Sequence, residues 1–374
     1  MGSRKGYYVF QNPYQDGVLQ FPGVLNKIEN QISILQSMYE MEKVVLEPGK
    51  SNIGKRFLPG SHLYNWDQVQ GNIINPSFVY IRKPAMDAGF LSFLKNIKKE
   101  NASTRVLLEL PTFPYDKEQF ASVINYPLFV KEYICRKRIH KYINRVITYS
   151  TDQEIFGIPT ISISNGIDPS KYPLVSGEKK DDTIRMIAVA TLQPYHGYER
   201  IILGMQEYYK NGGKREVELH IVGDGLAEEE LKRLVNVAGL ENRVFFYGRK
   251  SGEELTKIYN QADVGMGSFG FYKIDLDRAS SLKTREYLVR GLPVVSGCRQ
   301  DIFEEKECDF HLEFDNCSEP IKIEKVIEFY DFLHMQGNKE ILAKEIRKYA
   351  EENVTMKKAF DPVIQYLKYS AIDI

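Results

Sequence analysis

The sequence has no net charge, few cysteines, one tryptophan and no long apolar run. Its 374 residues include 50 Lys and Arg against 50 Asp and Glu. A surface adapted to a polyanion would be strongly basic and no nucleic-acid recognition module is present, so we expect no nucleic-acid partner. No apolar stretch approaches the roughly 18–20 residues that a membrane-spanning helix needs. Apolar residues still make up 43% of the chain, which excludes a disordered protein and is typical of a globular one.

The four cysteines are Cys135, Cys298, Cys308 and Cys317, and no two of them form a CxxC pair. We therefore predict no metal site on these residues and free thiols in a reducing cytosol. The first residues show no secretory signal pattern, which also predicts a cytoplasmic protein.

Short β-rich apolar runs alternate with helical patterns along the chain. Strands are predicted at residues 7–10, 43–46, 78–81, 106–108 and 146–149, and again at 186–190, 217–222, 244–247, 263–267 and 293–296. Helices are predicted at residues 23–39, 87–99, 198–209 and 282–290, and from about 321 onward. This alternation predicts an α/β protein with mostly parallel sheets and helices on both faces. A polar, turn-rich stretch separates the two series, so we expect domains at 1–170 and 184–354 joined by a linker at 171–183.

Residues 279–295 form the most informative segment, Ala-Ser-Ser-Leu-Lys-Thr-Arg-Glu-Tyr-Leu-Val-Arg-Gly-Leu-Pro-Val-Val. A helix starts here after two serines, and the free N–H groups and dipole of its first turn favour an anion. Lys283 adds a full positive charge, and Glu286 stands one turn further on, where a carboxylate can accept hydrogen bonds from ribose hydroxyls. A serine-capped helix with a solvated Lys/Glu face fits the same residues, and the spacing alone leaves both open.

This segment resembles the donor-nucleotide site of retaining GT-B glycosyltransferases of glycosyltransferase family 4, in the subgroup written Ser-x-Lys-x-x-Glu-Tyr-Leu-x-x-Gly-x-Pro. Residues 161–168, 190–197, 222–225 and 244–248 resemble further segments of that family in order and spacing. The resemblance implies a GT-B fold, with two Rossmann-like doubly wound domains facing each other across a cleft. The first would bind the acceptor and the second the donor, and a C-terminal helix at about 355–374 would pack back on the first.

The resemblance also implies the activity. We expect a hexosyltransferase of the EC 2.4 class that transfers a sugar with retention from a nucleotide diphosphate sugar, a UDP-sugar, to a saccharide or lipid-linked saccharide in surface-polysaccharide biosynthesis. No cofactor and no obligatory metal are implied, although the Asp-x-Asp at Asp275 and Asp277 would suit a Mg²⁺ on a diphosphate. Two alternatives stay open: a non-catalytic GT-B partner or scaffold of another glycosyltransferase, and a GT-B sugar-nucleotide epimerase.

The nucleotide-sugar site implied by the resemblance contains the following residues: Gly23, Thr191, His196, Arg249, Ser280, Ser281, Leu282, Lys283 and Glu286. Two departures from the family pattern affect it. Thr191 and His196 stand where the family commonly has Arg and Lys; an ordinary surface histidine is the alternative for His196.

The second departure concerns the family's first glutamate, which lies eight residues before the ribose-binding one and is Arg278 here, with Asp277 beside it. Either Asp277 replaces that acid, Arg278 contacts the diphosphate instead, or catalysis is impaired. We take Asp277, Arg278 and Lys283 as the catalytic candidates.

Two residues at predicted strand ends, Arg82 and Glu109, are candidates for the acceptor side; a surface arginine and a solvated loop acid are the alternatives. Residues 131–145 carry six bases and one acid and are predicted to form a helix. Bases interleaved with aromatics suit an anionic membrane surface, here the inner face of the plasma membrane. We therefore predict a membrane patch of Lys137, Arg138, Lys141 and Arg145, with a solvated helix face as the alternative.

Overall fold

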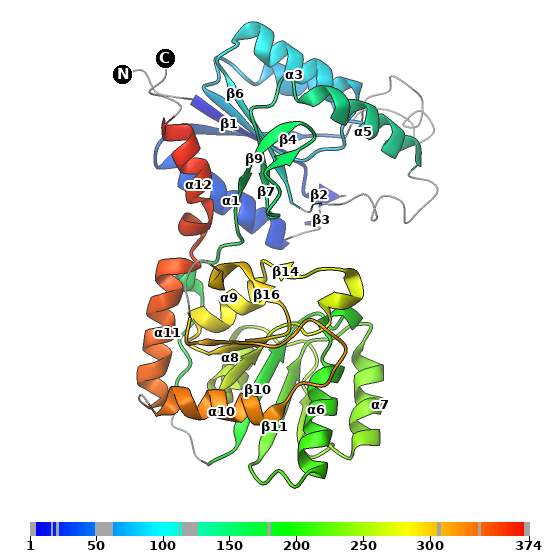
Figure 1. Ribbon diagram of the computed structural model, residues 1–374. Coiled ribbons are helices and arrows are strands. Elements are labelled where there is room, and N and C mark those ends of the chain that lie inside the picture. The colour runs from blue at the N-terminus through cyan, green and yellow to red at the C-terminus, as the bar shows by residue number, and fades with distance from the viewer. Residues whose placement is uncertain are drawn as a thin grey trace. The chain divides into compact units, whose positions relative to one another are not determined.

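The computed structural model describes residues 5–15, 18–19, 22–48, 63–111, 113, 126–177, 181–304, 308–335 and 338–369. The chain divides into two compact units: unit 1 comprises Met1–Ile163 with Phe360–Ile374, and unit 2 comprises Ser164–Ala359. Each unit has its own sheet of mostly parallel strands (Figure 1).

The sheet of unit 1 has the strand order β4-β1-β5-β6-β7-β9-β8. Its pairings are parallel, apart from the antiparallel pair of β8 with β9. The strands are β1 (Lys5–Gln11), β4 (Glu40–Leu46), β5 (Phe78–Arg82), β6 (Arg105–Leu110), β7 (Arg145–Thr148), β8 (Glu154–Ile155) and β9 (Ile158–Ser162). A separate antiparallel pair, β2 (Tyr14–Gln15) with β3 (Val18–Leu19), follows β1.

Successive strand residues point to opposite faces of this sheet, and they are apolar on both faces. Helices therefore cover both faces. Tyr7 and Val9 of β1 lie in a core with residues of α2 (Trp66–Gly71), α3 (Ala88–Glu100) and α5 (Tyr126–Ile139). Tyr8 and Phe10 lie in a second core with residues of α1 (Pro22–Gln36) and α12 (Met356–Tyr369). Strands buried on both faces need continuous apolar runs, which is why these runs are visible in the sequence.

Unit 2 repeats the architecture with the strand order β12-β11-β10-β13-β15-β17, all parallel. The strands are β10 (Ile184–Val189), β11 (Val217–Val222), β12 (Val244–Phe246), β13 (Val264–Met266), β15 (Val294–Ser296) and β17 (His311–Glu313). Short segments between them are β14 (Arg278–Ala279), which pairs with β16 (Arg299–Gln300), and the 3-10 turns η3 (Pro169–Lys171), η4 (Pro194–His196), η5 (Phe271–Ile274) and η6 (Asp301–Phe303).

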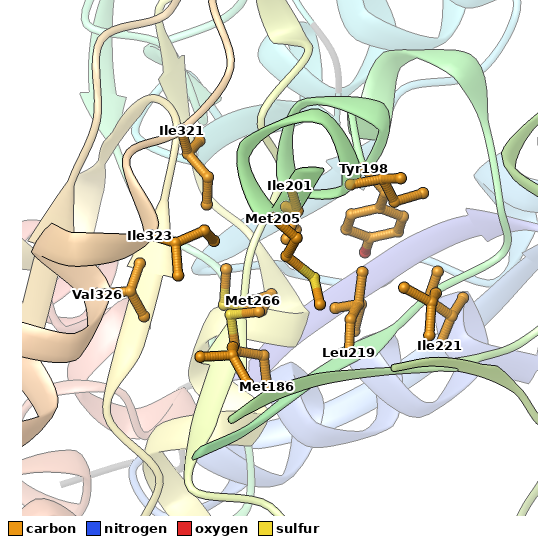
Figure 2. Close-up of a cluster of buried hydrophobic side chains, with 14 of the residues drawn as sticks. Met186, Tyr198, Ile201, Met205, Leu219, Ile221, Met266, Ile321, Ile323 and Val326 are labelled. Carbon is orange, nitrogen blue, oxygen red and sulfur yellow. The ribbon is translucent and has the colours of Figure 1, made fainter. Parts of the chain in front are cut away.

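The helices of unit 2 also lie on both faces. Residues of α6 (Glu199–Lys210), α7 (Glu228–Ala238) and α10 (Ile323–His334) form one core with Met186, Leu219 and Met266 of the strands. Figure 2 shows the part of this core formed by α6, α10 and the strands. Residues of α8 (Gly252–Gln261), α9 (Leu282–Val289) and α11 (Lys339–Asn353) form the other. The predicted α/β class, with two Rossmann-like doubly wound domains, is confirmed.

The predicted helix over residues 131–145 is too long, because α5 ends at Ile139. The Asn144 side-chain oxygen accepts from the Val106 N–H at 2.9 Å, and the Asn144 N–H donates to the Val106 carbonyl at 2.8 Å. These bonds attach the chain to β6 and direct it into the next strand, β7. Lys141 therefore lies after α5, and Arg145 is the first residue of β7. Similarly, α1 ends at Gln36, before the predicted end at residue 39. None of the helices in the described ranges combines the length and apolar character that a membrane crossing needs.

The contact between α6 and the segment before α10 generates a stability prediction. A Cβ added to Gly204 would lie 2.2 Å from the backbone oxygen of Ile321, which cannot yield as a flexible side chain would. We expect Gly204→Ala to lower the free energy of unfolding by about 1–3 kcal/mol, measured by urea denaturation.

Gly71 at the end of α2 is the matched control, because an added Cβ there meets nothing within 4 Å. Gly71→Ala should leave stability unchanged or raise it by up to about 1 kcal/mol. Equal effects of the two substitutions would contradict the contact at Gly204.

Candidate functional site

In unit 2 the loops that follow β10, β11, β13 and β15 leave the same edge of the sheet, because carboxyl ends of parallel strands lie together. Backbone contacts hold three of these loops against each other. Gly223 has φ 129°, and a Cβ there would lie 1.8 Å from the Ala190 oxygen. Gly197 has φ 68°, and a Cβ there would lie 2.3 Å from the Gly270 nitrogen. Only glycine permits both the conformation and the approach, so these loops have one mutual arrangement.

Lys283 lies in the first turn of α9, at the centre of this edge. Its Nζ donates to Ser268 Oγ at 3.0 Å and to the Tyr198 hydroxyl at 3.2 Å. Ser268 follows β13, and Tyr198 precedes α6, so the amine joins three segments. Burial lowers the pKa of the Lys283 ammonium to about 7. An amine of that pKa takes up a proton readily when an anion approaches.

The serines before α9 have different roles. Ser280 Oγ accepts from the Asn165 N–H at 2.8 Å, and the Ser280 carbonyl accepts from Asn165 Nδ2 at 2.6 Å. The Asn-Gly-Ile-Asp segment at 165–168 therefore fixes the loop that leads into α9. Ser281 is the N-cap residue, but its side chain makes no capping hydrogen bond, and Leu282 is 55% exposed. The N–H groups of the first turn are thus not occupied by the Ser281 side chain.

His196 is 8% exposed, so the alternative of a surface histidine is wrong. Its Nδ1 accepts from the Gln193 N–H at 3.3 Å, which assigns the imidazole proton to Nε2. Burial, followed by the nearby Lys283 charge, lowers the pKa of His196 to about 3. The ring is therefore neutral near pH 7 and has one N–H to donate. Thr191, on the same loop, is exposed.

Arg249 and Glu286 flank this group. Arg249 follows β12, is exposed, and its Nη2 lies 3.3 Å from Asp224 Oδ1. Glu286 lies one turn beyond Lys283 on α9, is half-buried, and its Oε1 accepts from Arg290 Nε at 2.9 Å. Sequence reasoning missed Arg290, although its i,i+4 spacing from Glu286 is a recognisable signal.

Arg278 and Asp277 have separate partners. Arg278 Nε donates to both carboxylate oxygens of Glu304, at 3.0 and 2.9 Å. Asp277 is exposed, and its Oδ1 accepts from Asn316 Nδ2 at 3.1 Å. Sequence reasoning missed Glu304, which reaches Arg278 because β14 pairs with β16. Across the described ranges, no three His, Cys, Asp or Glu side chains are grouped to hold a metal ion.

Unit 1 contains a second polar cluster, centred on Glu109. The alternative of a solvated loop acid is wrong, because Glu109 lies in β6 and is fully buried. Its carboxylate accepts from Tyr80 at 2.8 Å, Tyr149 at 3.1 Å, Tyr8 at 3.3 Å and Arg82 at 2.5 Å. Burial alone would raise the pKa of Glu109, but the charges of Arg82 and Lys27, with the tyrosine hydrogen bonds, hold it below the ordinary value. The carboxylate is therefore ionised and saturated with donors.

Arg82 is correspondingly not a plain surface arginine, since its side chain is 13% exposed and paired with Glu109. Gly23 is the second residue of α1 in the same unit.

The predicted membrane patch lies on unit 1. Lys137 and Arg138 are exposed on α5, and Lys141 is exposed just after it. Exposed apolar side chains of Val130, Tyr133 and Ile134 lie on the same helix. Arg145 is separate from α5, and its guanidinium lies 4.9 Å from the centre of the Tyr366 ring.

Comparison with known proteins identifies the fold. Residues 175–268 match the family model of glycosyl transferases group 1, and no curated protein matches the sequence. Three solved structures resemble the chain over nearly its whole length. They are HepE from Anabaena in complex with UDP (16% identity, TM-score 0.61, 98% of this chain and 100% of that chain), a glycosyltransferase from Rickettsia africae (11%, 0.63, 99% and 99%) and sucrose-phosphate synthase from Thermosynechococcus elongatus (12%, 0.60, 99% and 100%).

The fold is GT-B. The family match within unit 2 and the GT-B fold together support the group 1 glycosyltransferase family. The segment matched by the family model includes Thr191, His196 and Arg249 and ends at Ser268, the acceptor for Lys283.

The Glu109 cluster generates a prediction about unit 1. Glu109→Gln leaves the half-buried charges of Arg82 and Lys27 without their buried carboxylate, which should lower the free energy of unfolding by about 3–5 kcal/mol at pH 7. Because folding depresses the pKa of Glu109, its contribution is present above the ordinary value of 4.5 and is lost as the pH falls through the folded value.

Urea unfolding at several pH values measures this, and the difference between wild type and Glu109→Gln should shrink in acid. Glu29 is the matched control, because its exposed carboxylate pairs with Lys43 on the surface. Glu29→Gln should change stability by less than about 1 kcal/mol. A pH-independent difference at Glu109 would contradict an ionised buried carboxylate.

Proposed function

We propose that the protein is a retaining hexosyltransferase that transfers a sugar from a UDP-sugar to a saccharide or lipid-linked saccharide in surface-polysaccharide biosynthesis. The family match and the GT-B fold support glycosyl transfer from a nucleotide sugar. HepE, of the same fold, was solved with UDP. The observation that carries the proposal is the first turn of α9, where the Lys283 amine is held by Ser268 and Tyr198 with Glu286 one turn further on.

The diphosphate of the donor would lie at the start of α9. The uncapped N–H groups of Ser281, Leu282 and Lys283, the Lys283 ammonium and the Nε2–H of His196 are the donors available there. Negative charge develops on the leaving diphosphate as the glycosidic bond breaks through an oxocarbenium-like transition state. Fixed donors aimed at that charge are the main catalytic contribution we assign to this site.

Glu286 would bind the ribose through its carboxylate, and the backbone around Gly248 and Arg249 would read the base at the end of β12. Asp277 is our choice for the acid near the donor sugar, because its exposed carboxylate has one amide partner. Arg278 donates through Nε to both oxygens of Glu304, so we propose that any contact with a diphosphate uses its other guanidinium nitrogens. Thr191 completes the set of donor contacts that we propose within unit 2, and Gly23 in α1 stays a candidate from the family resemblance.

On the acceptor side, we assign contact to Arg82 and positioning to Glu109. Glu109 is fully buried and already accepts hydrogen bonds from three tyrosines and Arg82, so its effect on an acceptor would be exerted through Arg82. A lipid-linked acceptor would bring the enzyme to the inner face of the plasma membrane. Lys137, Arg138 and Lys141, next to the exposed Tyr133 and Ile134, have the composition that an anionic interface attracts.

The donor site can be tested through the protonation of Lys283. The pKa of Lys283 in the protein without ligand is about 7, and a bound diphosphate would favour the charged form of its amine. UDP should therefore bind with proton uptake, and its affinity should fall by up to about tenfold per pH unit between pH 7 and 9. Calorimetry in buffers of different ionisation enthalpy measures both quantities.

Lys283→Arg keeps its charge throughout this range, so UDP binding to that variant should depend little on pH. The same steep pH dependence in both proteins would remove Lys283 from the site. Absence of UDP binding to the wild type would overturn the proposed donor. Binding of UDP-sugars without any transfer to saccharide or lipid-linked acceptors would favour the scaffold alternative.

The membrane patch is tested by charge reversal. Changing Lys137, Arg138 and Lys141 to Glu should greatly reduce co-sedimentation with phosphatidylglycerol vesicles, because each base contributes about 1 kcal/mol at an anionic surface. The matched control reverses Lys348, Lys357 and Lys358, which are exposed in unit 2, and should sediment like the wild type. Equal sedimentation of the patch variant and the wild type would exclude this surface.

A further inference from the structure

Arg290, at the C-terminal end of α9, lies directly against Glu286. Its Nε is 2.9 Å from Glu286 Oε1, and the side chains of the two residues are 6% and 22% exposed. The two residues are one helical turn apart. The exposed fractions show that the Arg290 guanidinium is buried and that the Glu286 carboxylate reaches solvent. A charge pair of this kind holds the carboxylate from the protein side.

Two tyrosine rings lie against the guanidinium. Its Cζ lies 4.1 Å from the centre of the Tyr259 ring and 5.4 Å from that of Tyr172. Tyr259 belongs to α8, and Tyr172 follows η3. The main chain of Arg290 is anchored separately, because its carbonyl accepts from the Val175 N–H at 2.8 Å. Two separate segments therefore pack on the planar guanidinium, and a flexible lysine amine would not stack in this way.

The hydrogen-bond inventory of this cluster is incomplete at Arg290. Glu286 accepts from Arg290 through Oε1, and the Tyr259 hydroxyl lies close enough to the same carboxylate to interact with it. Among the described residues, Arg290 Nη1 is buried without a hydrogen-bond partner. An unpaired buried donor destabilises a fold, so stability alone does not account for a charged side chain at this position. What the arrangement does achieve is a carboxylate of fixed orientation that is still 22% exposed.

We propose that Arg290 is a positioning residue for Glu286, which holds the carboxylate so that its exposed side can accept from the vicinal hydroxyls of the donor's ribose. The inference rests on the proposed function, in which Glu286 binds that ribose. It assigns to Arg290 the discrimination between a ribonucleotide and a nucleotide without those hydroxyls. A carboxylate free to rotate would lose part of this discrimination, because each ligand hydrogen bond would then require the side chain to be ordered on binding.

The experiment measures the dissociation constants of UDP and of 2′,3′-dideoxyuridine diphosphate by calorimetry on the full chain. Their ratio reports hydrogen bonding to the ribose hydroxyls and is insensitive to a uniform loss of affinity. We expect a ratio of about tenfold or more in the wild type, since hydrogen bonds to a charged group are lost in the analogue. Glu286→Ala should bring the ratio near one, and Arg290→Met should reduce it several-fold.

Lys344 provides the matched control. It forms an i,i+4 pair with Glu340 at 2.7 Å on the exposed face of α11 in the same unit, so Lys344→Met removes one cation without touching the site. That variant should keep the wild-type ratio. An unchanged ratio in Arg290→Met, with the ratio lost in Glu286→Ala, overturns the positioning role and leaves the proposed function intact. A wild type that does not discriminate between the two nucleotides overturns the ribose assignment itself.

Circular dichroism and thermal unfolding establish whether Arg290→Met folds. If it does not, Arg290→Lys supplies the test, because lysine keeps the charge and loses the planar, stacked guanidinium. A ratio clearly below that of the wild type in this variant supports the proposal. A wild-type ratio in Arg290→Lys shows that the stacked geometry is dispensable and overturns it.

Discussion

The candidate donor site of unit 2 depends on one half-buried amine, Lys283, whose hydrogen-bond partners are neutral. Lys283 donates to the hydroxyls of Ser268 and Tyr198, and neither hydroxyl stabilises its charge as a carboxylate would. Burial therefore governs its proton affinity, and it depresses the pKa of the neighbouring His196 in the same way. At pH 7 an amine with a pKa of about 7 is only partly protonated. A bound anion would shift Lys283 toward its charged form.

In unit 1 the charged form of a side chain is stabilised, which is the opposite of what happens at Lys283. There a carboxylate is fully buried, and the fold surrounds Glu109 with cations and hydroxyl donors until it stays ionised. The tyrosines of β1, β5 and the end of β7 contribute because parallel strands bring residues distant in sequence close together. The two units thus share a sheet architecture, and each surrounds a charged side chain with hydroxyl groups, with opposite effects on its charged form.

The sequence predicts the fold class well because strands buried on both faces must contain continuous apolar runs, and β1, β5 and the second part of β10 contain such runs. The sequence predicts the ends of helices less well where a tertiary contact, rather than local composition, decides where the helix stops. The basic run that continues past Ile139 has helical composition, yet Asn144 is captured by the backbone of β6. The candidate donor residues are found only through the family resemblance, and their roles are not decided by the fold.

Residues such as Ser268, Tyr198 and Glu304 are missed for a different reason. Each is an ordinary polar side chain whose importance comes from a partner many residues away, so no local spacing marks it. The loop sequence around His196 also gives no sign that this side chain is buried. A surface histidine is therefore an equally good interpretation of the sequence alone.

The contact of Gly223 with the Ala190 carbonyl has a consequence for ligand affinity. These loops contact each other through their backbones, with no side chain between them. No side-chain rotamer at the contact has to be ordered when a nucleotide binds. The conformational entropy of ordering these loops is lost once, during folding, and is not lost again in each binding event. Rigid loops of this kind lower the entropic cost of binding a highly charged group, because fewer backbone and side-chain torsions have to be ordered when it binds.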